Sequence, residues 1–191
     1  RPFLRKVIRD VCELFPDAPF FHACFDETQG LTCEQLISHA NWCAEELRKH
    51  GKKMLMWVDM FKNHHGLDKL RLLSDNIIPV EWHYLDPTVV EGEYKRHGLK
   101  PCGLAGYNNW GVFLPDFRLG KRNMDAWAGM MRRLGGPGFA TSLWGDNGCE
   151  NSRDLCWNLY AYNAEAAWNG KKTHGLDFER RFHISFYGAP L

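Results

Sequence analysis

Two kinds of apolar segment alternate along the chain. In the first kind, apolar residues recur every three or four positions with charges between them, which predicts amphipathic helices at residues 2–15, 33–50, 123–134 and 154–169. In the second kind, apolar residues run together, which predicts buried strands at residues 20–28, 54–61, 76–85, 101–109 and 138–144. Since strands and helices take turns, the pattern predicts an α/β fold with a parallel sheet.

Smaller signals complete this outline. A short helical segment is expected at residues 67–73, a short basic helix or turn at 91–98, and a last segment at 176–187. Thr32 and Gln35 stand three positions apart, which predicts a capping box at the start of the second long helix.

The spacing of the strands is that of a (β/α)8 TIM barrel, which normally takes roughly 250 residues. Five of eight units in 191 residues would leave two uncovered sheet edges, which native folds avoid. We therefore interpret residues 1–191 as the C-terminal part of a single barrel domain, covering about strands 4 to 8, with the N-terminal strands missing from this chain. An open sheet is the alternative, but no glycine fingerprint supports it.

Composition narrows the choice of partner. The chain is 45% hydrophobic, with 24 basic and 23 acidic residues and a net charge of +1, so we expect neither a nucleic acid nor an anionic membrane as a partner. No apolar run approaches the roughly 20 residues of a membrane helix. Seven cysteines show no CxxC pair, and His64 and His65 have no second pair at ligand spacing, so no metal or cofactor is expected. The compartment is left open, because a signal peptide would precede Arg1.

Candidate chemistry begins at the first strand, where FFHACFDET ends in two adjacent carboxylates, Asp26 and Glu27. Ligands of sheets wound with helices bind at the carboxyl ends of the strands. Adjacent strand residues point to opposite faces, so the two acids share a site only if the backbone turns there. In the competing interpretation, Asp26 caps the following helix and Glu27 is solvated.

The other strands end in aromatic or acidic residues as well. These candidates for substrate binding are Trp57, Asp59, Trp82, Tyr84, Tyr107, Trp144 and Asp146. Indole rings offer apolar walls and carboxylates offer acceptors, a combination that suits a neutral polyhydroxylated ligand such as a sugar. Core packing is the alternative for each tryptophan taken singly, and it is the interpretation we favour for Trp127, Trp157 and Trp168 on the helices.

The segment FHACFDE resembles the His-x-Gly-x-Asp-Glu strand of glycoside hydrolase family 20, the β-N-acetylhexosaminidases. The later Trp-x-Asp, Trp-x-Tyr and Trp-Gly-Asp strand ends fall in the same order as that family's aromatic and acidic positions, and the last segment, DFERRFHISFYG, resembles a tail helix of some members. The resemblance spans most of the chain. It implies a carbohydrate substrate, an N-acetylhexosaminide, and substrate-assisted hydrolysis, an exception to the two-carboxylate scheme.

By this resemblance, each candidate acquires a role. Glu27 would protonate the glycosidic oxygen and later activate water, and Asp26 would orient the 2-acetamido group. The aromatic box around the acetamido methyl would consist of Trp57, Trp82 and Trp144. Tyr107 would bond the acetamido oxygen, and Asp146 would bind sugar hydroxyls where many members have Glu.

The sequence departs from the family pattern beside the acids. Cys24 replaces the glycine and is expected to pack in the interior, and Phe25 fills a position that is often small. These departures keep two alternatives open: a barrel of the same scaffold that binds N-acetyl sugars without turnover, and another hexosaminidase family on a barrel.

Overall fold

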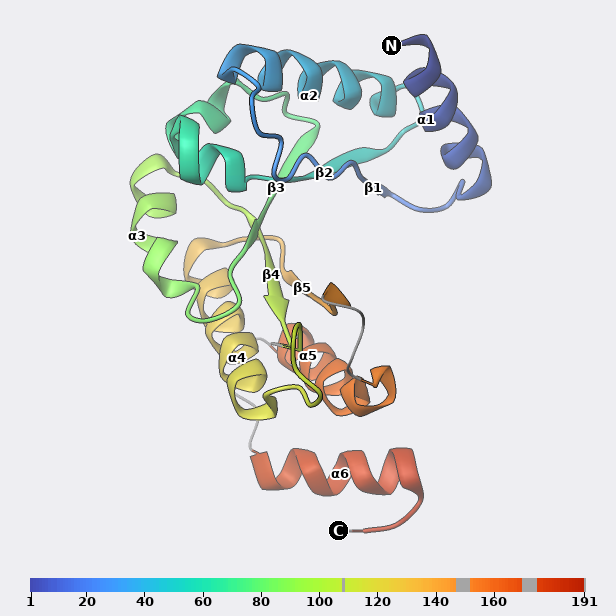
Figure 1. Ribbon diagram of the computed structural model, residues 1–191, viewed down its shortest axis with the longest axis vertical. Helices are drawn as coiled ribbons and strands as arrows, with labels where there is room; N and C mark the ends of the chain where they lie inside the picture. Colours follow the sequence, from blue (N-terminus) through green and yellow to red (C-terminus); the bar gives the residue numbers. More distant parts are fainter. Residues whose placement is uncertain (108, 147–151, 170–174, 191) are drawn as a thin grey trace. The chain divides into compact units, whose positions relative to one another are not determined.

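A computed structural model describes the chain except for residues 108, 147–151, 170–174 and 191. The polypeptide divides into two compact units, Arg1–Glu81 and Trp82–Leu191, and each is described by itself (Figure 1).

The first unit is a parallel sheet with helices. Its elements are α1 (Pro2–Leu14), β1 (Phe20–His22), α2 (Cys33–Arg48), β2 (Lys53–Trp57), the π-helical turn η1 (Phe61–His65), the 3-10 helix η2 (Leu67–Leu72) and β3 (Ile77–Trp82), whose last residue opens the second unit. Both β1 and β3 pair in parallel with β2, and α2 packs on β2. Leu36 and Leu47 of α2 and Met54 and Met56 of β2 have no exposed surface, so they form the core of this layer.

Polar contacts fix how the elements of the first unit connect. The buried Lys52 ammonium donates to the carbonyl oxygens of Phe15 and Ala18, at 2.7 and 2.6 Å, which ties the loop before β1 to the start of β2. Asn76 Nδ2 donates to the Ala44 and Lys52 carbonyls at 2.9 and 3.0 Å. Because these carbonyls are paired in the interior, the strands enter the sheet in a defined register.

The second unit comprises α3 (Thr88–His97), β4 (Cys102–Gly106), α4 (Phe117–Leu134), β5 (Phe139–Ser142), the 3-10 turn η4 (Arg153–Cys156), α5 (Trp157–Asn169) and α6 (Gly175–Tyr187). Strands β4 and β5 pair in parallel, and α4 packs on β4 and on α5. The fully buried Trp127 of α4 lies against Gly103, where a Cβ would come within 2.4 Å of the indole ring. A glycine at 103 therefore lets helix and strand approach closely.

The structure confirms the predicted alternation of strands and helices, with parallel pairing in each unit, and this architecture fits part of a TIM barrel. The capping box is also present: Thr32 Oγ1 accepts from the Gln35 amide and Gln35 Oε1 accepts from the Thr32 amide. Asp26 is therefore not the cap of this helix. That the strands are numbers 4 to 8 of a barrel stays a prediction.

Several boundaries and side chains differ from expectation. Strand β2 ends at Trp57, four residues early, because the backbone turns into η1; α4 begins six residues early, because Asp116 caps it by accepting from the Leu119 amide at 2.8 Å. Cys24 is exposed rather than packed in the interior. Of the three helix tryptophans expected to pack in the core, Trp127 is buried, whereas Trp157 is exposed and Trp168 is 92% exposed, so core packing was the wrong interpretation for these two. No helix in the described part of the chain is long and apolar enough to cross a membrane.

Candidate functional site

The acids lie on an irregular turn that follows β1. The turn stays attached to β2, because the Ala23 amide donates to the Leu55 carbonyl and the Trp57 amide donates to the Cys24 carbonyl, both at 2.9 Å. Three residues of the turn have left-handed backbone conformations: Cys24 (φ 60), Phe25 (φ 80) and Glu27 (φ 51). Each such residue with a side chain costs roughly 1–2 kcal/mol, so contacts of the surrounding structure must hold the turn.

Two side chains supply those contacts. His22 Nδ1 accepts from the Cys24 amide at 3.1 Å, and the His22 ring packs 4.3 Å from the Trp57 ring. Asp59 Oδ2 accepts from the Glu27 amide at 3.1 Å. Burial lowers the pKa of His22, opposed by the charge of Asp26, so the imidazole is neutral at pH 7 and carries its proton on Nε2. Both ends of the left-handed stretch are thereby hydrogen-bonded.

The predicted residues of the first unit differ in exposure. Glu27 is exposed and Asp26 is half-buried, whereas Trp57 and Asp59 are buried. Asp26 interacts electrostatically with both His22 and Cys24. Desolvation raises the pKa of the Cys24 thiol, and the charge of Asp26 raises it further. The turn therefore directs one carboxylate to solvent and keeps the other among the residues that shape it, so the two neighbouring acids have different surroundings.

Aromatic residues gather at the strand ends of the second unit. The rings of Trp82 and Tyr84 stack with centroids 5.3 Å apart, and the Trp110 ring lies 5.1 Å from that of Tyr84. Trp144 Nε1 donates to the Tyr84 hydroxyl at 2.9 Å. Three predicted residues, Trp82, Tyr84 and Trp144, are thus in contact around one tyrosine, with Trp110 as a fourth member that the prediction did not include.

The buried side-chain amide of Asn123 holds the backbone around this aromatic cluster. Asn123 Nδ2 donates to the carbonyls of His83 and Leu85 at 2.8 and 2.9 Å, and Asn123 Oδ1 accepts from the Gly106 amide at 3.2 Å. A Cβ at Gly106 would lie 2.5 Å from the Tyr84 ring. The end of β4 and the segment after β3 are therefore pinned together, and the Tyr84 ring covers the glycine.

Tyr107 lies beneath the surface. Its ring is fully buried and packs edge-on against Tyr160, with centroids 4.8 Å apart. Burial raises the pKa of the Tyr107 hydroxyl far above its usual range, so the phenol stays protonated at any physiological pH. A protonated phenol can donate a hydrogen bond, as the predicted contact with an acetamido oxygen requires.

The last predicted residues follow β5. Trp144 is partly exposed, and its carbonyl accepts from Asn109 Nδ2 at 2.7 Å, which joins the segment after β5 to the segment after β4. Asp146 is exposed and stands directly before the residues that the structure does not describe. The predicted sugar contact of Asp146 stays a prediction.

The residues that sequence reasoning left out of the site are mainly polar supports: His22, Asn109 and Asn123, together with Trp110. His22 could have been included because it is the first residue of the segment that resembles His-x-Gly-x-Asp-Glu. Asn109 and Trp110 could have been included because they stand two and three positions after the candidate Tyr107. Asn123 gave no signal, because it lies within a helix pattern and acts on a strand end far away in the sequence.

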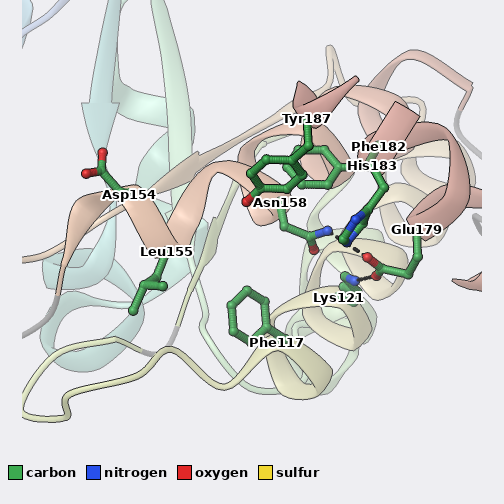
Figure 2. Close-up of a pocket in the computed structure, with 9 residues that line it drawn as sticks. All are labelled: Phe117, Lys121, Asp154, Leu155, Asn158, Glu179, Phe182, His183 and Tyr187. Carbon is green, nitrogen blue, oxygen red and sulfur yellow. Dashed lines mark hydrogen bonds and ion pairs between the residues drawn. The ribbon is translucent and has the colours of Figure 1, made fainter. Parts of the chain in front are cut away.

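No group of three or more His, Cys, Asp or Glu side chains within the described residues could hold a metal ion. A cavity of about 520 Å³ opens in the second unit between α4, η4, α5 and α6, and none of the predicted site residues lines it (Figure 2). Lys121 and Glu179 form an ion pair there, and Asn158 Nδ2 donates to Glu179 Oε2 at 2.8 Å. Through these two contacts Glu179 of α6 is joined to Lys121 of α4 and Asn158 of α5.

No protein-family model and no curated protein matches the sequence. Solved structures do match the fold. Dispersin B matches at a TM-score of 0.61 and 17% identity, over 90% of this chain and 59% of that one. The β-N-acetylhexosaminidase of Bacteroides fragilis matches at a TM-score of 0.58 and 18% identity, over 97% and 41%. A glycoside hydrolase family 20 exo-β-N-acetylglucosaminidase from Vibrio harveyi, in complex with N-acetylglucosamine, matches at 0.62 and 18%, over 98% and 34%.

These matches establish the fold: the chain is folded like part of the catalytic domain of family 20 hexosaminidases. It spans between 34% and 59% of the length of the structures just named.

Proposed function

We propose that this chain belongs to a β-N-acetylhexosaminidase and carries its catalytic acids. The observation that carries the proposal is the turn after β1, where Asp26 and Glu27 follow a parallel strand on a strained backbone that His22 and Asp59 hold in place. The fold shared with family 20 hexosaminidases supports it, as does the N-acetylglucosamine bound in the Vibrio harveyi structure.

In the proposed reaction the substrate supplies the nucleophile. The Glu27 carboxyl donates its proton to the glycosidic oxygen while the carbonyl oxygen of the 2-acetamido group attacks C1, so the bond from C1 to the leaving group breaks as the new bond forms. The acetamido oxygen and C1 then belong to a new five-membered ring. Glu27, now a carboxylate, takes a proton from water, and this water attacks C1 and breaks the bond from C1 to the acetamido oxygen. Asp26 orients the acetamido group and stabilises the positive charge that develops on it.

Substrate binding falls to the aromatic residues at the strand ends. We assign Trp57, Trp82 and Trp144 to the walls around the acetamido methyl and Tyr107 to its oxygen. Tyr84, which accepts from Trp144 Nε1, orients that indole. Asp146 binds sugar hydroxyls. In this proposal residues 1–191 form one part of a single barrel domain, with strands 4 to 8.

A second candidate is a barrel that binds N-acetyl sugars without turnover. It is favoured by one observation: Cys24 stands where the family pattern has glycine, at a φ of 60 that glycine adopts without strain.

Hydrolysis of an aryl N-acetyl-β-glucosaminide by the intact protein separates the two candidates. We expect turnover of this substrate and none of the matching glucoside, because only the former carries the internal nucleophile. Glu27→Gln should lower kcat by about 10² to 10⁴-fold, the usual contribution of a general acid, while the sugar still binds.

Galacto-configured substrates should be assayed in parallel, since the configuration preferred is not part of the proposal. Binding of N-acetylglucosamine without turnover of substrates of either configuration would exclude the enzymatic function and favour the non-catalytic sugar-binding barrel. Equal turnover of the plain glucoside would exclude the substrate-assisted mechanism.

A further inference from the structure

The Asp59 carboxylate lies directly behind the catalytic turn. Asp59 is 3% exposed, and its Oδ2 accepts from the Glu27 amide at 3.1 Å. We propose that Asp59 is a positioning residue, which holds the Glu27 backbone in its left-handed conformation and so aims the Glu27 carboxyl at the glycosidic oxygen. This inference rests on the proposed function for its effect on catalysis, but the contact itself is testable without activity.

The burial of Asp59 is unfavourable in itself. Its second oxygen, Oδ1, is shielded from solvent and makes no hydrogen bond within the part of the chain that the structure describes. Burying a carboxylate that has one unpaired oxygen destabilises a fold. The hydrogen bond with the Glu27 amide offsets part of this cost and gives the buried side chain a role.

The conformation of the turn shows why an anchor is needed. Glu27 has a φ of 51, and Cys24 and Phe25 upstream are also left-handed, so the relaxed backbone of this segment would differ from the one observed. His22 holds the upstream end through the Cys24 amide, and Asp59 holds the downstream end. Loss of the downstream contact would let Glu27 rotate to an ordinary conformation, which redirects its side chain.

A direct sugar contact was the role that the sequence indicated for Asp59. Since Asp59 Oδ2 already accepts from the Glu27 amide, that contact explains the position of the side chain better. The two roles predict different kinetics. A sugar ligand affects KM, whereas a residue that only aims the acid affects kcat.

Three variants of the intact protein test the assignment: Asp59→Ala, Asp59→Asn and, as a control, Glu46→Ala, which removes another buried carboxylate of the same unit. We expect Asp59→Ala to lower kcat by about 100-fold with little change in KM, the scale of loss from a misplaced catalytic group. Asp59→Asn should recover most of kcat, because its amide oxygen still accepts from Glu27. Glu46→Ala should leave kcat unchanged.

Hydrogen exchange of the Glu27 amide provides the readout that needs no turnover. Asp59→Ala should speed exchange of the Glu27 amide severalfold. The Trp57 amide, which donates to the Cys24 carbonyl, should keep its protection. Unchanged exchange at Glu27 would overturn the assignment, as would a rise in KM at constant kcat or an equal loss of kcat in Asp59→Asn. If the wild-type protein hydrolyses no hexosaminide but the Glu27 amide exchanges faster in Asp59→Ala, the proposed enzymatic function is refuted. The positioning contact between Asp59 and Glu27 is then still supported.

Discussion

At the scale of single residues, close approach between backbone and ring decides which side chains the fold tolerates. Gly103 and Gly106 of β4 both face aromatic rings, those of Trp127 and Tyr84, at distances that leave no room for a Cβ. The second of these glycines lies under the aromatic cluster of the candidate site. Small residues in this strand therefore set how deep the aromatic side chains sit.

Gly103→Ala tests this close packing away from the acids. The new Cβ would lie 2.4 Å from the Trp127 ring, so we expect a loss of roughly 1–3 kcal/mol in the free energy of unfolding, the usual cost of overpacking. Gly92→Ala in α3 is the matched control, because no atom lies within 4 Å of its added Cβ; it should be neutral or stabilise by up to about 1 kcal/mol. Chemical denaturation of both variants measures the difference, and equal stabilities would contradict the packing argument.

At the scale of elements, ion pairs join neighbouring helices. Arg133 of α4 donates to both carboxylate oxygens of Glu91 of α3, at 2.8 and 2.7 Å, and Lys95 pairs with the same acid. These contacts hold the pKa of Glu91 at about 2, below its usual value of 4.5. A carboxylate with a depressed pKa contributes stability above the unfolded value, and loses that contribution as the pH falls.

Glu91→Gln should therefore destabilise the protein by about 2 kcal/mol at pH 7, the range of hydrogen bonds to charged groups. The difference from wild type should shrink between pH 4.5 and about 2, where wild-type Glu91 itself becomes protonated. Unfolding at a series of pH values measures this convergence. A difference that stayed constant down to pH 2 would show that the charge of Glu91 is not what joins the two helices.

The same scale shows what sequence patterns predict well. Helix α2 follows from periodic apolar residues and a capping box, both local features, and strand order follows from the alternation of patterns. The end of β2 was missed because the apolar run MLMWVDMF continues into a π-helical turn, where burial persists but the strand does not. The true start of α4 was missed because the segment before residue 123 lacks clear periodicity, and the Asp116 cap decides it.

At the scale of the whole molecule, the candidate site residues fall in two compact units, with the acids in one and the aromatic cluster in the other. The sequence could predict that these residues stand at or after strand ends, because that depends on topology alone. It could not predict the anchoring contacts. The bonds from Asp59 to Glu27 and from Asn123 to three backbone groups join positions 17 to 40 residues apart, and such pairings leave no periodic signal.

The exposed thiol of Cys24, on the same turn as the acids, offers a chemical reporter of occupancy. Because its pKa is raised, alkylation should be slow at neutral pH and faster as the pH rises and thiolate forms. A sugar bound over the acids should slow the labelling of Cys24 relative to Cys33, which mass spectrometry of the two peptides would measure. Equal rates with and without a saturating sugar would place the bound ligand away from this turn.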